Sequence, residues 1–486
     1  MNIVWLKRDL RTQDHHLFHL AERQMEHSDY RIVYIFEHQL FELDNISLRH
    51  QQFIFHSLLD INRTLSKYSR KVDILYGDAK EIFGYLDSTF GIDTVFSYEE
   101  HGTPKSWSRD KEIKLFFSQS GIEWIEIPSD NVIRGKRDRR GWDKLWYKQI
   151  SEDLIVNTYS LSNSVFEIDQ FQLPDELIKK LETYPSSYQA AGESNAHKYL
   201  QSFIQERGRN YHRYISKPIE SRVSCSRLSV YLAWGNLSIK QAYQRIRQSE
   251  EFDYNKRAYG AMLTRLKWRS HFIQKFETEC QYAVRCINKA YEQMPYENDV
   301  QKLEAWKSGN TGIPLVDANM RCLIETGWIN FRMRAMLVSV LCHHLDIDWK
   351  LGAPHLAQMF LDYEPGIHYP QVQMQAGTTG VNTVRVYNPV KQALDHDPKS
   401  VFILTWVPEL KALPDQFIQC PWILTDMDQL FYNFNLGESY PIPIVDLETA
   451  GRRGRNKIWS FRERQDVKRE ALRILKTHTR RRSTTD

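Results

Sequence analysis

Several short segments in the second half of the chain carry residue types that helical packing alone does not require. The segment 224–229, SCSRLS, places small hydroxyls and one arginine at the start of a predicted helix. Exposed backbone N–H groups, short hydroxyls and a guanidinium together suit a phosphate group. A simple helix N-cap is the alternative explanation of the same residues.

A second segment, 265–269, reads RLKWR. On a helix, Arg265, Trp268 and Arg269 share one face, so an indole would lie between two guanidinium groups. This arrangement suits stacking on an aromatic ligand or a nucleobase. A cation–π cluster on the protein surface is the alternative.

Arg334 and Asp362 are charged residues inside otherwise apolar helical segments, which predicts a buried ion pair between them. Taken singly, each of these residues is better explained by a structural pair than by a functional site. No Ser/His/Asp set and no P-loop can be assembled from the sequence. The adjacent His343 and His344 do not converge on one ion, so no metal site is expected.

These segments need a scaffold, and the first 130 residues predict one part of it. Apolar, β-branched runs predict strands at 3–6, 31–36, 72–76, 94–98 and 124–127. Helical spacing at 15–27, 48–68, 79–89 and 105–119 alternates with them. The alternation predicts an α/β domain with a five-stranded parallel, doubly wound sheet. No GxGxxG follows the first strand, so an ordinary dinucleotide site is not expected there.

The remaining chain has a different character. Residues 131–190 are irregular and predict a connector between domains. From residue 191 to the end, helical periodicity dominates, which predicts an all-α domain ending in a basic tail. The predicted helices lie at 195–207, 226–248, 256–290, 300–307, 315–326, 330–346, 353–362 and 455–476. The expected domains are therefore 1–130, 131–190 and 191–486.

Composition excludes several classes of protein. The 486 residues are 42% hydrophobic and 26% charged, which argues against disorder. The longest apolar runs fall short of a membrane span, and the amino terminus becomes charged at Lys7. Six cysteines without a CxxC argue against a zinc finger or a secreted disulfide framework. A cytoplasmic, monomeric protein with no membrane partner is expected.

Positive charge is concentrated in two places. Residues 451–486 contain 13 Lys/Arg and 4 Asp/Glu, and residues 134–148 contain seven basic and two acidic residues interleaved with Trp142, Trp146 and Tyr147. Such clusters suit a polyanion such as DNA. Solvated surface segments are the alternative explanation.

The order of the motifs resembles one family. WLKRDLRTQDH at 5–15 is similar to that family's first strand and loop, and SCSRLS to its flavin-phosphate segment. AWKSGNTGIPLVDANMRCLIETGW, NPVKQALDHDP, WVPEL and YPIPIV follow in the family's order. Over nearly its whole length, the chain resembles the cryptochrome/photolyase family, as a divergent bacterial-type member.

The resemblance implies a helical domain that holds FAD and an α/β domain that carries an antenna pigment, a folate or a deazaflavin, in many members. In repair members, UV-damaged DNA presents a flipped-out pyrimidine pair to the flavin cavity. By the same resemblance, the FAD phosphates would be held by Tyr211, Cys225, Ser226, Arg227, Leu228 and Ser229. The flavin and adenine pocket would be lined by Arg269, Arg334, Asp362 and Glu364.

The substrate side departs from the family pattern. Trp268 would stack on the flipped lesion, and Arg332 lies beside the expected lesion contacts. Arg265 stands where enzymes for cyclobutane dimers usually have Glu. Phe331 replaces the expected Asn, and Ala335 the expected Met. Histidine, which enzymes for (6-4) photoproducts have at both of these last positions, is also absent.

The photoreduction path departs as well. The usual three-Trp relay retains Trp349, but Val372 occupies the position nearest the flavin, and Tyr296 aligns near the outermost position. His368 occupies the position that faces flavin N5. Tyr369 or another nearby aromatic is therefore predicted to donate the electron, with Trp349 as the next carrier and Tyr296 as a possible exit.

The sequence thus predicts a blue-light-driven DNA photolyase that splits pyrimidine dimers by electron transfer. The alternative is a cryptochrome-type photoreceptor with little or no repair activity, which the departures at Arg265, Phe331 and Ala335 favour. A nucleic-acid-binding protein that retains FAD only structurally is the third possibility.

Overall fold

The computed structural model describes residues 1–24, 29–41, 45–129, 131–162 and 167–479. The chain forms two compact units, each built from several stretches of sequence. The first unit comprises Met1–Arg209, Ser226–Ala283 and Leu361–Gly366, and the second comprises Asn210–Cys225, Val284–Phe360 and Ile367–Asp486. The predicted basic tail extends beyond the described residues at 480–486.

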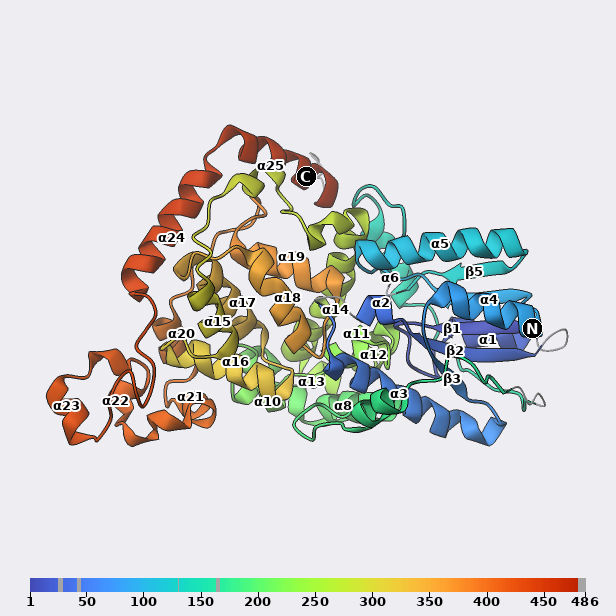
Figure 1. Ribbon diagram of the computed structural model, residues 1–486, viewed down its shortest axis with the longest axis horizontal. Helices are drawn as coiled ribbons and strands as arrows, with labels where there is room; N and C mark the ends of the chain where they lie inside the picture. The colour runs from blue at the N-terminus through green and yellow to red at the C-terminus, as the bar shows by residue number, and fades with distance from the viewer. Residues whose placement is uncertain (25–28, 42–44, 130, 163–166, 480–486) are drawn as a thin grey trace. The chain divides into compact units, whose positions relative to one another are not determined.

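The first unit contains the predicted five-stranded parallel sheet (Figure 1). Its strands are β1 (Asn2–Leu6), β2 (Tyr30–Phe36), β3 (Val72–Tyr76), β4 (Thr94–Tyr98) and β5 (Glu123–Ile127). They pair in the order β3-β2-β1-β4-β5, with Val4 opposite Ile32 on one side and Phe96 on the other. The predicted fold class is confirmed, and each strand begins within one residue of its predicted start.

Helices cover both faces of the sheet because the strand order reverses after β3. The connections β1–β2–β3 run outward on one side, through α1 (His16–Arg23) and α3 (Leu48–Leu65). The chain then returns to β4 and β5 through α4 (Ala79–Phe90) and α5 (Pro104–Ser120). Right-handed crossovers therefore place the two helix pairs on opposite faces. Alternate strand residues such as Trp5 and Val33 pack with Phe83 and Phe117 in the core under α4 and α5.

The predicted connector is more ordered than expected. It forms α6 (Trp142–Ile150) and α7 (Asp175–Glu182). Trp142, Trp146 and Ile150 are spaced four residues apart, and all three are buried. This spacing makes one apolar stripe on a helix, so the local pattern favours a helix despite the charges around it.

The other helices of the first unit are α2 (His38–Phe41), α8 (Glu193–Gln205), α11 (Ser229–Ala233), α12 (Ile239–Arg247), α13 (Glu251–Tyr254) and α14 (Lys256–Thr278). The single helix predicted at 226–248 is broken between α11 and α12. Gly235 there has a φ of +74°, and an added Cβ would overlap the carbonyl oxygen of Arg8. A close approach of two backbones thus ends the helix.

The described part of the second unit is helical apart from turns and one isolated bridge. Its helices are α9 (Tyr211–Tyr214), α10 (Glu220–Ser224), α15 (Val300–Ser308), α16 (Pro314–Thr326), α17 (Phe331–Ser339), α18 (Trp349–Met359), α19 (Pro365–Ala376, which begins in the first unit), α20 (Pro389–His396), α21 (Val401–Trp406), α22 (Asp415–Ile418), α23 (Asp426–Phe431), α24 (Leu447–Arg462) and α25 (Gln465–His478). A π-helical turn at Val340–His344 continues α17. Every helix in the described part of the chain is too short or too polar to span a bilayer.

Candidate functional site

The structure divides the sequence-predicted site residues between the two units. The first unit contains Ser226, Arg227, Leu228, Ser229, Arg265, Trp268, Arg269, Asp362 and Glu364. The second contains Tyr211, Cys225, Tyr296, Phe331, Arg332, Arg334, Trp349, His368 and Tyr369. Arg334 and Asp362 fall in different units, so their pairing stays a prediction.

The segment SCSRLS has the backbone shape of an anion site. Arg227 is left-handed, with a φ of +59°, and Leu228 is right-handed, with a φ of −81°. Successive left- and right-handed residues direct their N–H groups to one side, which makes a small concave nest for an anionic oxygen. Ser224, the last residue of α10, has a buried hydroxyl with no hydrogen-bond partner among the described residues. The segment therefore fits the phosphate-binding role that the sequence predicts.

The helix α14 separates two of its predicted site residues. Trp268 is 52% exposed, and the Arg265 guanidinium carbon lies 5.7 Å from its ring centroid. Arg269 is buried instead, and its guanidinium donates to the Leu232 carbonyl oxygen at 2.8 Å. The indole thus presents a free surface to solvent while the next residue along the helix points into the protein.

Arg269 forms an ion pair that the sequence did not predict. Its nitrogen lies 3.6 Å from Glu364 Oε2, and Arg8 lies 3.6 Å from the same oxygen. The Gly366 backbone N–H donates to the other oxygen, Glu364 Oε1, at 3.3 Å. One buried carboxylate therefore binds two guanidinium groups. The sequence signal that could have identified Arg8 is the charged run that follows β1, because ligands bind near the carboxyl ends of parallel strands.

In the second unit, two residues predicted to line the flavin are fixed by backbone carbonyls. Arg334 Nε donates to the Ile329 oxygen at 2.9 Å, and its guanidinium carbon lies 4.0 Å from the Phe360 ring centroid. His368 Nε2 lies 2.9 Å from the Ala353 oxygen. Since a carbonyl only accepts, Nε2 carries the proton, and a neutral ring then presents Nδ1 as an acceptor. Tyr211 is also buried, at the start of α9.

Trp349, the retained relay residue, is buried at the first position of α18. Its indole N–H donates to Cys286 Sγ at 3.5 Å. Burial raises the pKa of the Cys286 thiol to about 12, so this thiol is protonated at neutral pH and cannot take the indole proton. Tyr369 is buried too, with its ring edge-on to His368 at 5.1 Å.

The surroundings of Tyr296 disfavour the predicted role as an exit for the electron hole. Its hydroxyl is buried with no hydrogen-bond partner among the described residues, and burial raises its pKa well above the ordinary value. Lys457 Nζ lies 4.3 Å from the ring centroid. Oxidation of a phenol releases a proton, which finds no acceptor here, and the nearby cation opposes the loss of an electron.

Phe331 and Arg332 begin α17 and present an aromatic ring beside a cation. Phe331 is 47% exposed, and Arg332 donates to the Tyr387 hydroxyl at 3.2 Å. Asn330 caps this helix by accepting from the Met333 N–H at 3.0 Å. An exposed ring next to a guanidinium suits contact with a nucleobase and its phosphate.

The structure buries two aromatic residues of one basic segment and pairs many cations of the other with acids. Trp142 and Trp146 are core residues, 0% and 1% exposed, so their indoles do not stack on a ligand. Many of the tail's cations lie in ion pairs with acids, for example Arg453 with Glu297 at 2.7 Å and Lys457 with Asp346. These pairs reduce the positive field that the composition of the tail predicts.

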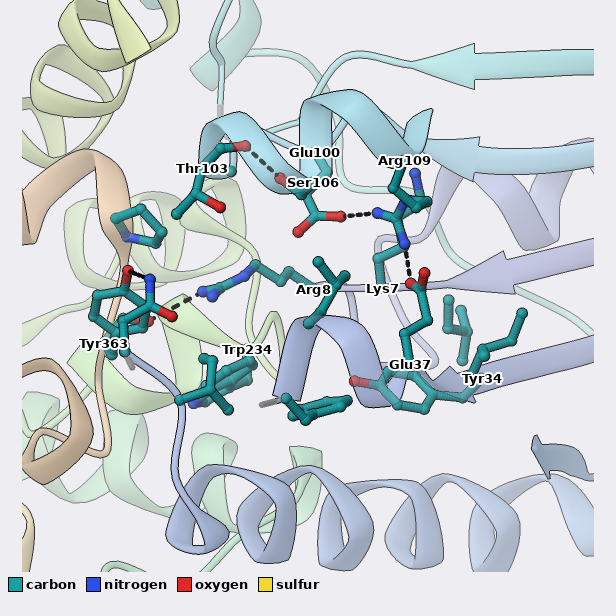
Figure 2. A pocket seen from close by; sticks show the side chains of 18 of the residues that line it. Lys7, Arg8, Tyr34, Glu37, Glu100, Thr103, Ser106, Arg109, Trp234 and Tyr363 are labelled. Carbon is teal, nitrogen blue, oxygen red and sulfur yellow. Dashed lines mark hydrogen bonds and ion pairs between the residues drawn. The ribbon is translucent and has the colours of Figure 1, made fainter. Parts of the chain in front are cut away.

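A cavity of about 690 Å³, including its open mouth, lies in the first unit beyond the carboxyl ends of β1 and β2 (Figure 2). Its labelled lining residues are Lys7, Arg8, Tyr34, Glu37, Glu100, Thr103, Ser106, Arg109, Trp234 and Tyr363. Arg109 bridges Glu37 and Glu100, and burial raises the pKa of Glu37 to about 7. Aromatic walls and a charged floor suit a flat aromatic ligand with polar edges. Sequence reasoning did not single out these residues.

Comparisons with known proteins agree with this architecture. The family model described as "FAD binding domain of DNA photolyase" matches residues 262–460, and the model "DNA photolyase" matches residues 2–138. The deoxyribodipyrimidine photo-lyase of Alkalihalophilus pseudofirmus is 28% identical over 475 residues, covering 92% of this chain and 95% of that protein. A cryptochrome DASH of Synechocystis sp. is 33% identical over 229 residues, covering 46% of each chain.

Solved structures share the fold. A bacterial class III photolyase from Agrobacterium tumefaciens has a TM-score of 0.82 at 23% identity and covers 95% of this chain and 98% of its own. The Synechocystis sp. cryptochrome has a TM-score of 0.83, also at 23% identity, over 94% of this chain and 98% of its own.

Proposed function

Since the chain belongs to the cryptochrome/photolyase family and contains its FAD-binding domain, we propose that it is a DNA photolyase that repairs UV-induced pyrimidine dimers in blue light. When bound, reduced FAD supplies the excited electron that opens the dimer and takes that electron back afterwards, so the reaction has no net redox change. The protein's own residues bind and orient the two partners and hold the base outside the duplex.

One observation carries this proposal over the alternatives, namely the position of Trp268. The ring is half exposed on α14, beside the cation of Arg265, while the adjacent Arg269 is buried against Glu364. A base that stacks on Trp268 therefore lies one helical residue from a side chain predicted to line the flavin pocket. Repair requires this proximity, whereas a photoreceptor without repair has no use for an exposed indole there.

The decisive experiment compares repair of two lesions under illumination. Oligonucleotides with a single cyclobutane dimer or a single (6-4) photoproduct are illuminated with the purified protein, and restored pyrimidines are counted. We expect repair of one lesion in light and of neither in the dark. If FAD is bound but neither lesion is repaired, the proposal fails.

The specific observation in favour of a signalling photoreceptor is the chemistry around the expected lesion. Arg265 places a cation where a carboxylate is usual in cyclobutane-dimer enzymes, and Phe331 replaces an amide with an apolar ring. The first change replaces the acceptors of a carboxylate with donors, and the second removes an amide, so both positions lose the usual hydrogen-bonding partner of a base edge. A photoreceptor would show light-dependent spectral changes without repair. A DNA-binding protein with structural FAD would bind DNA equally in light and in darkness.

Replacing Trp268 by alanine is expected to weaken binding of lesion-bearing duplex by about 5- to 150-fold, because base–aromatic stacking contributes about 1–3 kcal/mol. Fluorescence anisotropy at fixed salt measures the change. Trp459→Ala is a matched control, since that indole is 43% exposed with an arginine, Arg462, 5.4 Å from its ring centroid. Equal losses in both variants, or none at Trp268, would contradict the assigned role.

Replacing Trp349 by phenylalanine is expected to slow photoreduction of bound FAD without changing FAD content. Phenylalanine keeps much of the packing but lacks the easily oxidised indole. The rate is measured from the absorbance of the flavin, which is recorded during illumination. Trp306→Phe is the control, because this buried indole of the same unit also makes a hydrogen bond, to the Leu337 carbonyl at 3.2 Å, but has no place in the predicted relay. Equal rates in Trp349→Phe and the parent would show that the electron takes another route.

We further propose that the cavity beyond the carboxyl ends of β1 and β2 holds the antenna pigment, a folate or a deazaflavin. Its place beyond the strand ends and its aromatic walls support this assignment. Release of a second chromophore besides FAD on denaturation, and its loss from an Arg109→Met variant, would agree with the proposal. If purified protein that is saturated with FAD releases FAD and no second chromophore, this result would contradict the proposal.

A further inference from the structure

Arg8 makes contacts that reach far beyond its own strand. It lies two residues after the end of β1, and its guanidinium stacks on Trp234, with the guanidinium carbon 4.4 Å from the ring centroid. Its Nη1 atom donates to the carbonyl oxygens of Ala233 at 3.3 Å and Tyr363 at 3.1 Å. The same nitrogen lies 3.6 Å from Glu364 Oε2. One nitrogen atom is therefore the meeting point of three polar contacts (Figure 2 shows the one to Tyr363).

The backbone on which Arg8 sits is fixed. The Leu10 N–H donates to the Trp234 carbonyl at 3.1 Å, and Arg11 donates to the Gly235 carbonyl at 3.2 Å. The left-handed Gly235 lies so close to Arg8 that a Cβ at this position would overlap the Arg8 carbonyl oxygen. The base of the Arg8 side chain is thus held in register with residues 233–235.

The segment Leu361–Gly366 is attached to this fixed frame. Trp234 Nε1 donates to the Leu361 carbonyl at 2.8 Å, and Asn45 donates to the Tyr363 hydroxyl at 2.7 Å. Arg8 adds the bond to the Tyr363 carbonyl and the ion pair with Glu364. The six-residue segment therefore takes its position from the carboxyl edge of the sheet, although more than 350 residues separate it from β1 in sequence.

Glu364 transmits this position to a second residue of the predicted flavin pocket. Its Oε2 atom lies 3.6 Å from Arg8 and 3.6 Å from Arg269. Two guanidinium groups that share one carboxylate oxygen fix its orientation more tightly than either alone, because the charges attract from two directions and the pair is shielded from water. If the Arg8 charge is removed, Glu364 is free to turn toward Arg269 alone.

We infer that Arg8 is a positioning residue for FAD, acting through Glu364 and the segment 361–366. This inference rests on the proposed function, since it presumes that the protein binds FAD. Arg8 itself needs no contact with the cofactor. It holds the carboxylate and the backbone on which two predicted pocket residues, Asp362 and Glu364, are presented.

The test uses full-length FAD-loaded protein and the variants Arg8→Met and Arg8→Lys. Methionine keeps much of the stem and its packing on Trp234 but makes none of the three polar contacts. Lysine keeps one charged nitrogen with three donors, which matches the convergence of the contacts on Nη1. The FAD dissociation rate and the visible-region circular dichroism of the bound flavin are measured for each variant.

We expect Arg8→Met to raise the FAD dissociation rate about ten-fold or more and to change the visible dichroism, as loss of charge-assisted bonds to a binding-site wall requires. Arg8→Lys should restore both readouts most of the way to the wild-type values. Arg31→Met is the matched control, because Arg31 also forms a shielded ion pair in this sheet, with Asp73 at 2.7 Å, but is the second residue of β2, at the amino end of that strand, whereas Arg8 lies beyond the carboxyl end of β1.

Wild-type dissociation and dichroism in Arg8→Met would overturn the inference while leaving the proposed function intact. Failure of Arg8→Lys to restore either readout, or an equal loss in Arg31→Met, would also overturn it, since the effect would then reflect general stability. Arg8→Gln replaces Arg8→Met if the latter does not fold. If the wild-type protein neither contains FAD nor takes it up, this result would instead contradict the proposed function itself.

Discussion

Replacing Asp317 by alanine is expected to lower the local free energy of unfolding of the second unit by about 3–5 kcal/mol. The Asp317 carboxylate is fully buried and accepts four hydrogen bonds. They come from the Thr311 N–H at 2.8 Å, the Thr311 hydroxyl at 2.6 Å, the Gly312 N–H at 3.0 Å and the Tyr440 hydroxyl at 2.5 Å. Alanine strands all four buried donors, each of which costs about 1–3 kcal/mol before relaxation.

Hydrogen exchange of peptides covering 311–326 measures this effect locally, which avoids assuming two-state unfolding of a two-unit chain. Tyr440→Phe removes a single donor and should cost about 1.5–3 kcal/mol. Asp426→Ala, at an exposed turn of α23, is the control and should change little. A loss below about 1 kcal/mol in Asp317→Ala would show that water or a rearranged loop replaces the carboxylate.

The adjacent histidines of the π-helical turn are expected to make the protein markedly less stable in mild acid. His343 and His344 are 3% and 2% exposed, and burial lowers the pKa of each to about 4. The folded state therefore keeps both rings neutral between pH 6.5 and 4, whereas the unfolded chain binds protons there. Stability is full above the ordinary pKa and falls as pH drops below it, by about 2 kcal/mol for each ring at pH 5.

Thermal unfolding at pH 7.5 and pH 5, followed by the fluorescence of released flavin, measures this loss. His344→Gln is the informative variant, because burial lowers the pKa of His344 to about 4, as it does for His343, whose ring also bonds to the Gln375 carbonyl at 3.0 Å. Glutamine cannot be protonated, so the variant should lose about half of the pH dependence. An unchanged difference between the two pH values would place the acid sensitivity elsewhere.

In the α/β part of the chain, the sequence predicted the start of each strand to within one residue. Each strand is a short run of apolar and β-branched residues flanked by polar ones. The strands β1 to β4 are mostly buried, whereas β5, at the edge of the sheet, is only half-buried. Hydrophobic periodicity of this kind depends only on residues close together in the sequence, so it indicates a strand whatever the tertiary contacts are. The ordered motifs identified the family for the same reason, because they are local strings of residues.

Helix ends were less predictable where another part of the chain decides them. The helix predicted at 226–248 breaks where the backbone of Arg8 approaches Gly235. Arg8 is remote in sequence, so the residues of 226–248 alone do not indicate the break. Trp142 and Trp146 lie within a basic segment that suits a polyanion, yet both indoles are buried. Charge density indicates what a segment could bind, but the packing partners decide which of its side chains reach the surface.

For the candidate site, the sequence by itself determined which residue types are present and which helices carry them. It predicted Arg269, Glu364 and the phosphate segment as parts of one pocket by resemblance, and it marked Trp268 as the stacking ring. Only the tertiary structure decided that Arg269 turns inward while Trp268 faces solvent, and that Arg8 shares Glu364 with Arg269. A charged side chain has many possible partners along a chain of 486 residues. Burial selects one of these partners, and burial exists only after the chain has packed.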